Sequence, residues 1–264
     1  MRQILLPFVD RMFKEFPRAT FKKLFIATMT EYDAAFPTHT AFPPQHIAQP
    51  LAKVIADAGL RQLHVAEKEK YAHITYFLNG GREEPFEHED RVIVPSVANV
   101  TDYDQKPEMS AREIADKVIE AVRSQKYDFI AANFANGDMV GHTGNIPAAI
   151  TGLEVMDECV GTIMSEVLNV GGALYVTADH GNCEEMINLD TGEADTEHST
   201  NPVPFWVAAP DNKRATPANP ISTIITRGIS ADVAPTIIKM MGLKKPKAMT
   251  GTSLIKVIGQ LPLP

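Results

Sequence analysis

Apolar runs and amphipathic stretches alternate along most of this chain, a pattern typical of strands that alternate with helices. Short apolar runs predict strands over residues 23–28, 62–66, 128–133, 173–178 and 203–209. Apolar residues at helical spacing, with Gly or Pro near the ends, predict helices over residues 51–58, 147–167 and 230–241. The alternation favours an α/β fold in three layers, a mostly parallel sheet with helices on both faces.

A further helix is predicted after Ser110. Ser110 and Glu113 have the spacing of a capping box, in which each side chain bonds a free backbone amide. The apolar stripe by which this helix would pack on the sheet is Ile114, Ala115, Val118, Ile119 and Val122. The Ala41–Pro44 sequence ends in two prolines, which stiffen a connector, so we predict a hinge there.

The composition is that of an ordinary globular protein, since 44% of the 264 residues are hydrophobic and 22% are charged. A formal net charge of -8 argues against a nucleic acid or an anionic membrane as the main partner. No apolar run reaches the roughly 18 residues that cross a bilayer, and the Met1–Val9 patch is too short for a signal sequence. Cys159 and Cys183 are too few for a disulfide framework, so we expect a reducing, cytoplasmic location.

Two acidic and imidazole pairs stand beside glycines. Asp179 and His180 directly follow the predicted strand 173–178, at the carboxyl end where open α/β sheets bind their ligands. Neighbouring side chains on a regular strand point to opposite faces, so both reach one cation only on irregular backbone, which Gly181 permits. Asp138 precedes His142 by four positions in a glycine-rich stretch that we expect to be loosely structured.

His198, just before the predicted strand 203–209, is a fifth candidate ligand. Carboxylate oxygens together with imidazole nitrogens suit Mn, Zn or Fe. Five such groups exceed what one tetrahedral ion needs, so we infer two metal ions. Taken singly, Asp138 is also typical of a turn, and His142 or His198 of a surface or packed imidazole.

Lys70 and Cys183 each allow two interpretations. Lys70 ends the charged Glu67–Lys70 run, which is typical of a solvent-exposed face, but it could instead hold its ammonium group near a phosphate. Cys183 lies next to the second acidic pair, yet no basic neighbour in the sequence would activate its thiol. We therefore interpret Cys183 as incidental.

Taken together, these motifs closely resemble the cofactor-independent (2,3-bisphosphoglycerate-independent) phosphoglycerate mutases, which belong to the alkaline-phosphatase superfamily. The resemblance rests on residues 69–73, 136–144, 177–182 and 197–204, with further matches over 29–33, 77–83 and 106–110. It covers essentially every residue here but corresponds only to the carboxyl-terminal half of the family's chain. It implies an alkaline-phosphatase-like α/β fold that is incomplete at the amino terminus.

The resemblance also implies roles for single residues. By resemblance, the ligands of one Mn²⁺ are Asp138, His142 and His198, and those of the other are Asp179 and His180. Mg, Co or Zn could replace Mn. Lys70 falls on the family's substrate-binding lysine, near the phosphoryl group in transfer. The family's remaining Asp ligand and its nucleophilic Ser lie in an amino-terminal segment that has no counterpart in this chain.

By the same resemblance, residues 1–40 would be the tail of the inserted phosphotransferase domain and a hinge, and residues 41–264 the phosphatase domain without its amino-terminal segment. The implied reaction interconverts 3-phosphoglycerate and 2-phosphoglycerate through a phosphoserine, and we expect the 264 residues alone to be inactive. The expected partner is this small substrate, with no nucleic acid or membrane, and the complete enzyme is expected to be a monomer. A related metal-dependent phosphatase or sulfatase, or an inactive metal-binding fragment, are the alternatives.

Overall fold

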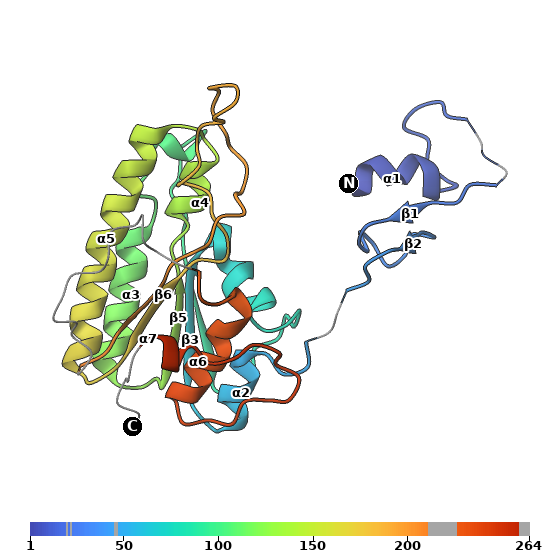
Figure 1. The fold of residues 1–264 in the computed structure, drawn as a ribbon. Helices are drawn as coiled ribbons and strands as arrows, with labels where there is room; N and C mark the ends of the chain where they lie inside the picture. The colour runs from blue at the N-terminus through green and yellow to red at the C-terminus, as the bar shows by residue number, and fades with distance from the viewer. Residues whose placement is uncertain (20, 22, 45–46, 211–225, 259–264) are drawn as a thin grey trace. The chain divides into compact units, whose positions relative to one another are not determined.

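The structure is a computed structural model that describes residues 1–264 except for 20, 22, 45–46, 211–225 and 259–264 (Figure 1). The chain forms two compact units, Met1–Ile47 and Ala48–Pro264, which are described separately. The assignment of residues 1–40 and 41–264 to two domains of one family stays a prediction.

The first unit contains little regular structure. Its helix α1 spans Arg2–Val9, and its strands β1 (Ala27–Thr28) and β2 (His39–Thr40) pair in parallel. Of the predicted strand 23–28, only the last two residues are strand. Among the described residues of this unit, Thr28 alone is buried, so the unit has no hydrophobic core of its own.

A parallel sheet forms the centre of the second unit. Its strands are β3 (Gln62–Glu67), β4 (Glu89–Val94) and β5 (Phe129–Asn133), in the order β4-β3-β5. Both neighbours of β3 run parallel to it, which confirms the predicted α/β fold with a parallel sheet. The sequence pattern did not predict β4, because this strand begins with the charged sequence Glu-Asp-Arg.

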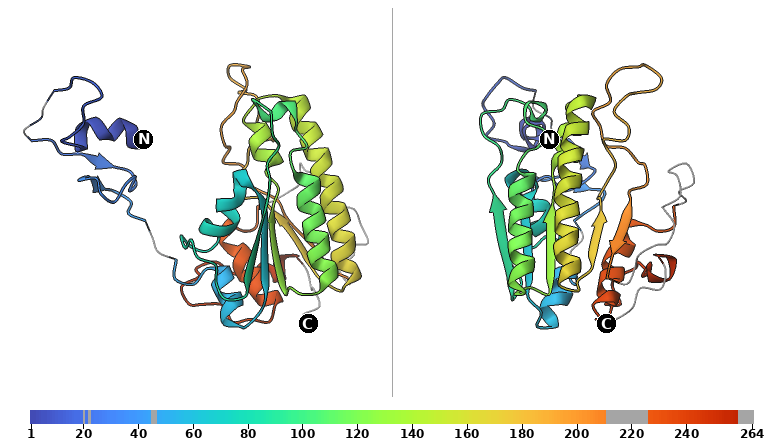
Figure 2. Two further views of the ribbon diagram at one scale, coloured as in Figure 1. Left: turned by 180° about the vertical axis from the view of Figure 1, so that it is seen from behind. Right: turned by 90° about the vertical axis from the view of Figure 1, so that its left-hand side faces the viewer.

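Helices cover both faces of this sheet. Leu63 and Val65 pack against the helices α3 (Ala111–Ser124) and α5 (Ile146–Asn169), which lie side by side. On the opposite face, α2 (Leu51–Asp57) and α6 (Val233–Met240) share a second core with Phe129 of β5 (Figure 2). The three helices predicted over 51–58, 147–167 and 230–241 are therefore present.

Two further strands depart from the predicted arrangement. The strands β6 (Leu174–Thr177) and β7 (Phe205–Ala208) pair with each other in antiparallel orientation. Residues 178–204, all of which the structure describes, form loops and no crossover helix, and a crossover is what a parallel return needs. As a result the start of β7 lies next to the end of β6, with Phe205 opposite Thr177.

The capping box predicted at Ser110 is wrong. The Ser110 hydroxyl donates a hydrogen bond to the Pro95 carbonyl oxygen, at 2.7 Å, and no side chain caps α3 at this position. The predicted apolar stripe is correct, since Ile114, Ala115, Val118 and Val122 are buried and Ile119 packs against them. Among the described helices, none combines the length and apolar character that a membrane span requires.

Candidate metal centre

Asp138 and His142 are placed by a short helix that follows β5. The glycine-rich stretch, expected to be loose, forms α4 (Asn136–Gly141), and the His142 amide donates to the Asp138 carbonyl oxygen at 3.1 Å. One helical turn therefore separates the two side chains and puts both on one face. Gly141 serves close packing here, because a Cβ on it would lie 2.2 Å from Oδ1 of Asn182.

His198 reaches the same place through the antiparallel return of the chain. Its neighbour Ser199 forms an isolated bridge with Gly181, and the Ser199 amide donates to the Gly181 carbonyl oxygen at 3.0 Å. This bridge joins the loop that contains His198 to the loop that follows β6. Asp179 and His180 lie in that second loop, one residue after the end of β6.

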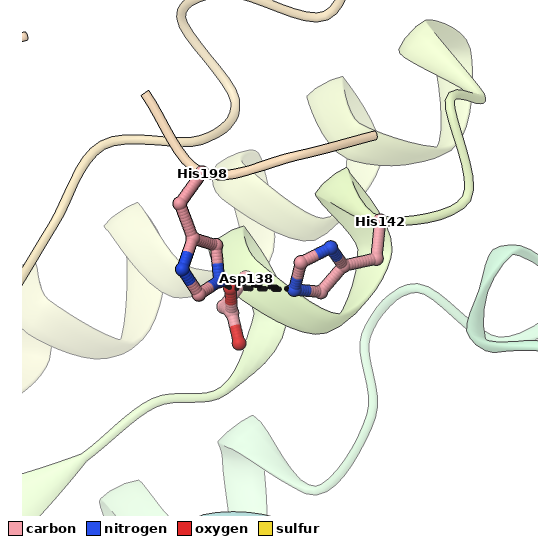
Figure 3. A group of neighbouring side chains, drawn as sticks. All are labelled: Asp138, His142 and His198. Atoms are coloured by element: carbon pink, nitrogen blue, oxygen red, sulfur yellow. Dashed lines mark hydrogen bonds and ion pairs between the residues drawn. The ribbon is translucent and has the colours of Figure 1, made fainter. Parts of the chain in front are cut away.

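Three side chains converge on one point (Figure 3). Oδ1 of Asp138 lies 2.9 Å from Nε2 of His198 and 3.1 Å from Nε2 of His142, and the two Nε2 atoms are 3.1 Å apart. One possible ligand atom from each residue lies within 4.8 Å of the others. Asp138, His142 and His198 are therefore a possible metal site.

The hydrogen bonding of His142 fits a metal ligand. Its Nδ1 lies 2.6 Å from the carbonyl oxygen of Thr196, which can only accept, so Nδ1 carries the proton. A neutral imidazole protonated at Nδ1 presents an unprotonated Nε2, the atom that faces Asp138. Metal-binding histidines usually donate a hydrogen bond from their other ring nitrogen in this way, which fixes the orientation of the ring and its tautomer.

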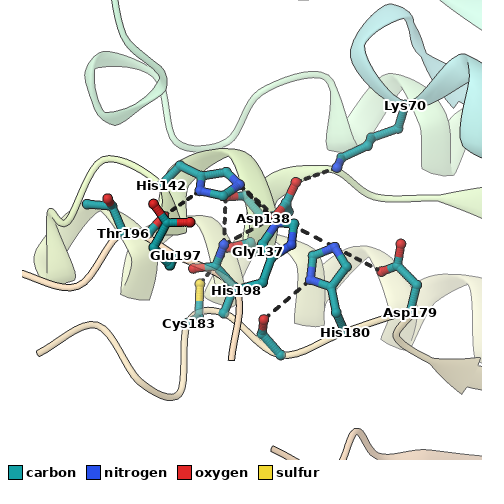
Figure 4. A network of polar contacts seen from close by, with 12 residues as sticks. Lys70, Gly137, Asp138, His142, Asp179, His180, Cys183, Thr196, Glu197 and His198 are labelled. Carbon is teal, nitrogen blue, oxygen red and sulfur yellow. Dashed lines mark hydrogen bonds and ion pairs between the residues drawn. The ribbon is translucent and has the colours of Figure 1, made fainter. Parts of the chain in front are cut away.

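The second predicted pair lies beside the first three residues (Figure 4). Nε2 of His180 is 3.8 Å from Oδ1 of Asp138 and 3.6 Å from Oδ1 of Asp179, and its ring stacks on that of His198 at 3.7 Å. The side chain of Asp179 is 64% exposed and lies at the edge of the group. The structure thus gathers all five residues, whereas their division between two ions stays a prediction.

Lys70 is part of this group, so its interpretation as a solvent-exposed charge is wrong. It ends a short 3₁₀ helix, Lys68–Lys70, that follows β3, and it is only 8% exposed. Its ammonium group forms an ion pair with Oδ2 of Asp138. Burial alone would raise the pKa of Asp138, but Lys70 and the Asn182 amide outweigh it and lower this pKa to about 2. Asp138 therefore stays ionised, as a metal ligand must be.

Sequence reasoning missed three residues around this centre. Asn182 donates a hydrogen bond to Asp138 in α4, and Glu184 accepts one from the Asn182 backbone amide. His73 lies near this centre, since its pKa is lowered first by burial and then by the charge of the Lys70 ammonium. Position was one signal, since Asn182 and Glu184 lie two and four positions after His180 and His73 lies three positions after Lys70. A second was the resemblance, because its motifs 69–73 and 177–182 contain His73 and Asn182. Cys183 plays a structural part, because its Sγ lies 2.7 Å from the Gly137 carbonyl oxygen and burial raises its thiol pKa.

Comparisons with known proteins agree with a metal-binding protein. A model of the metalloenzyme superfamily matches residues 10–245. A 2,3-bisphosphoglycerate-independent phosphoglycerate mutase of Thermomicrobium roseum is 51% identical over 92% of this chain and 46% of its own. That of Syntrophotalea carbinolica is 48% identical over 97% of this chain and 48% of its own.

A solved structure agrees with these sequence matches. The phosphoglycerate mutase of Leishmania mexicana, crystallised at low cobalt concentration, superimposes with a TM-score of 0.71 and 30% identity. The match covers 95% of this chain and 47% of that one. The chain therefore spans about half the length of the relatives that it matches.

Proposed function

The chain belongs to the metalloenzyme superfamily, and it is homologous to 2,3-bisphosphoglycerate-independent phosphoglycerate mutases over about half of their length. We therefore propose that it forms the metal-binding part of such a mutase. The complete enzyme would interconvert 3-phosphoglycerate and 2-phosphoglycerate. The observation that carries this proposal is the convergence of Asp138, His142 and His198, with Lys70 beside them.

The proposed ligands of the first ion are Asp138, His142 and His198, and those of the second include Asp179 and His180. Manganese is the proposed metal because the resemblance to the phosphoglycerate mutases implies it, and the mixed donor set of carboxylate oxygen and imidazole nitrogen suits Mn as it suits Zn or Fe. Bound divalent ions would supply positive charge for a phosphoryl group and would acidify a nearby hydroxyl. Their charge exceeds that of Asp138 and Asp179, which explains how an acidic protein accepts an acidic substrate.

Lys70 is proposed to contact the phosphoryl group in transfer. Its ammonium is held in place by Asp138 and by burial, so little side-chain freedom remains to be lost when a substrate binds. A fixed point charge of this kind stabilises the negative oxygens of the group. The nucleophilic Ser is proposed to lie in the half of the mutase outside these 264 residues.

The proposal is tested by adding that missing half. The segment of the Thermomicrobium roseum enzyme that lies outside the match would be co-expressed with the 264 residues, and 2-phosphoglycerate formation followed by phosphorus NMR with and without Mn²⁺. We expect Mn-dependent conversion of 3-phosphoglycerate by the complex, and none by the complex that carries His198→Ala.

Two other results would contradict the proposal. Conversion by the 264 residues alone would show that the nucleophile is in this chain. Release of inorganic phosphate from simple phosphate monoesters, without any isomerisation, would instead identify a metal-dependent phosphatase. A calorimetric titration of the chain with Mn²⁺ separates metal binding from either activity.

A further inference from the structure

Asn182 connects the loop after β6 to the short helix α4. It is 6% exposed, and its Nδ2 donates to Oδ1 of Asp138 at 3.1 Å and to the Asp138 carbonyl oxygen at 3.4 Å. Asp138 belongs to the first proposed metal site, whereas Asn182 follows the Asp179–His180 pair of the second. Asn182 is therefore a direct link between the two sites.

Glu184 connects the same loop to the one that contains His198. One carboxylate oxygen, Oε2, accepts the backbone amide of Asn182 at 2.9 Å. The other, Oε1, accepts the Ser199 hydroxyl and the Asn201 side-chain amide, the latter at 3.2 Å. A single carboxylate thus holds the two loops that deliver His180 and His198.

Two glycines make room for these links. A Cβ on Gly181 would lie 2.2 Å from both Oε1 of Glu184 and Oγ of Ser199. A Cβ on Gly141 would lie equally close to Oδ1 of Asn182, at 2.2 Å. Real Cβ atoms do not approach so closely, so both links depend on residues without a side chain at these two positions.

We propose that Asn182 and Glu184 are positioning residues that hold the ligands of both metal sites in one arrangement. Asn182 orients the Asp138 carboxylate, and Glu184 fastens the His198 loop to the His180 loop. This inference rests on the proposed function, since it takes those residues as metal ligands. Loss of either link lets one set of ligands move relative to the other, so metal affinity falls.

The test uses the 264-residue chain with Asn182→Ala and Glu184→Gln, each titrated with Mn²⁺ by calorimetry well below the melting temperature. We expect each variant to bind Mn²⁺ roughly 10-fold to 100-fold more weakly than wild type, the range found for groups that support metal ligands. Glu184→Gln keeps the shape of the side chain but turns one acceptor into a donor. Its new amide would then face a donor, either the Asn182 amide or Asn201.

Glu185→Gln is the matched control. Among the residues that the structure describes, the carboxylate of the adjacent Glu185 accepts a hydrogen bond from Asn201 and none from the Asn182 backbone amide or from Ser199. We expect this variant to bind Mn²⁺ like wild type. Wild-type affinity in Asn182→Ala or in Glu184→Gln would overturn the role of that residue. Failure of the wild-type chain itself to bind Mn²⁺ would instead overturn the proposed function and the inference with it.

A second measurement needs no metal. The Ser199 amide donates to the Gly181 carbonyl oxygen, so it is protected from hydrogen exchange while the two loops are joined. In the metal-free chain, Glu184→Gln should speed exchange at Ser199, and Glu185→Gln should not. Unchanged exchange in Glu184→Gln would refute the fastening of the loops.

Discussion

Glu67 gives the sharpest prediction, because it is a carboxylate at the end of β3 with no exposed surface. Among the residues that the structure describes, neither of its oxygens makes a hydrogen bond of ordinary geometry, and the nearby Ser96 hydroxyl and Ser110 amide only partly offset the effect of burial on its pKa. Burial raises the pKa of Glu67 from 4.5 to about 7, and the nearby carboxylate of Glu69 adds to the rise. The folded protein therefore holds this proton more tightly than the unfolded chain does.

The magnitude follows from that difference. Each unit of pKa corresponds to about 1.4 kcal/mol, so Glu67 changes the free energy of unfolding by about 3 kcal/mol between the two protonation states. Because the folded-state pKa is the higher one, the contribution of protonated Glu67 to the free energy of unfolding is fully present below about pH 4.5. It is lost as the pH rises to about 7. Above that pH the folded protein carries a buried charge.

Glu67→Gln removes this charge while keeping the shape. At pH 8 we expect the variant to be about 3 kcal/mol more stable than wild type, and close to wild type at pH 4.5. Urea denaturation at both pH values measures the difference. The exposed carboxylate of Glu154 in α5, which forms no ion pair with any residue that the structure describes, is the control, since Glu154→Gln should change stability nearly equally at both pH values. The same stability difference for Glu67→Gln at both pH values would refute the reasoning.

Two further predictions concern the ion pair at the centre and the packing of α5. Lys70→Met leaves the Asp138 carboxylate without its buried partner, so the metal-free chain should lose about 3 kcal/mol of unfolding free energy; urea melts should show a smaller loss at saturating Mn²⁺, and an equal loss would contradict this. Gly161→Ala should stabilise the chain by about 1 kcal/mol, because a Cβ there meets nothing within 4 Å. Gly152→Ala in the same helix should destabilise it in thermal melts, because its Cβ would lie 2.9 Å from the Pro107 carbonyl oxygen; a gain in stability would count against this packing.

The sequence predicted those parts of the fold in which the local pattern and the tertiary packing agree. The apolar stripe of α3 and the strand β3 are examples, since their apolar residues face the core. β4 was missed because its charged first half hides an apolar second half. The direction of β7 was also beyond reach, since it depends on the path of the 178–204 loops rather than on the strand itself.

The same limit applies to the candidate metal centre. Its five predicted residues have side chains that can themselves bind a metal ion, so their types and glycine neighbours were enough to single them out. Lys70 was open to interpretation as a surface charge because its ion-pair partner, Asp138, is distant in the sequence and no local pattern indicates that Lys70 is buried. Asn182 and Glu184 act through contacts with residues far apart in the chain, such as Asp138 and Ser199, and no local pattern encodes these contacts.

The antiparallel return of β7 has a consequence for how the chain folds. Asp138 and His198 are 60 positions apart, and they meet only after β5, β6 and β7 have taken their places. A cation captured between them would therefore act late, locking an arrangement that the helices and strands have already built. Removal of such a cation by a chelator should accordingly unfold the loops around Asp138 and His198 first, while the α3 and α5 layer stays folded.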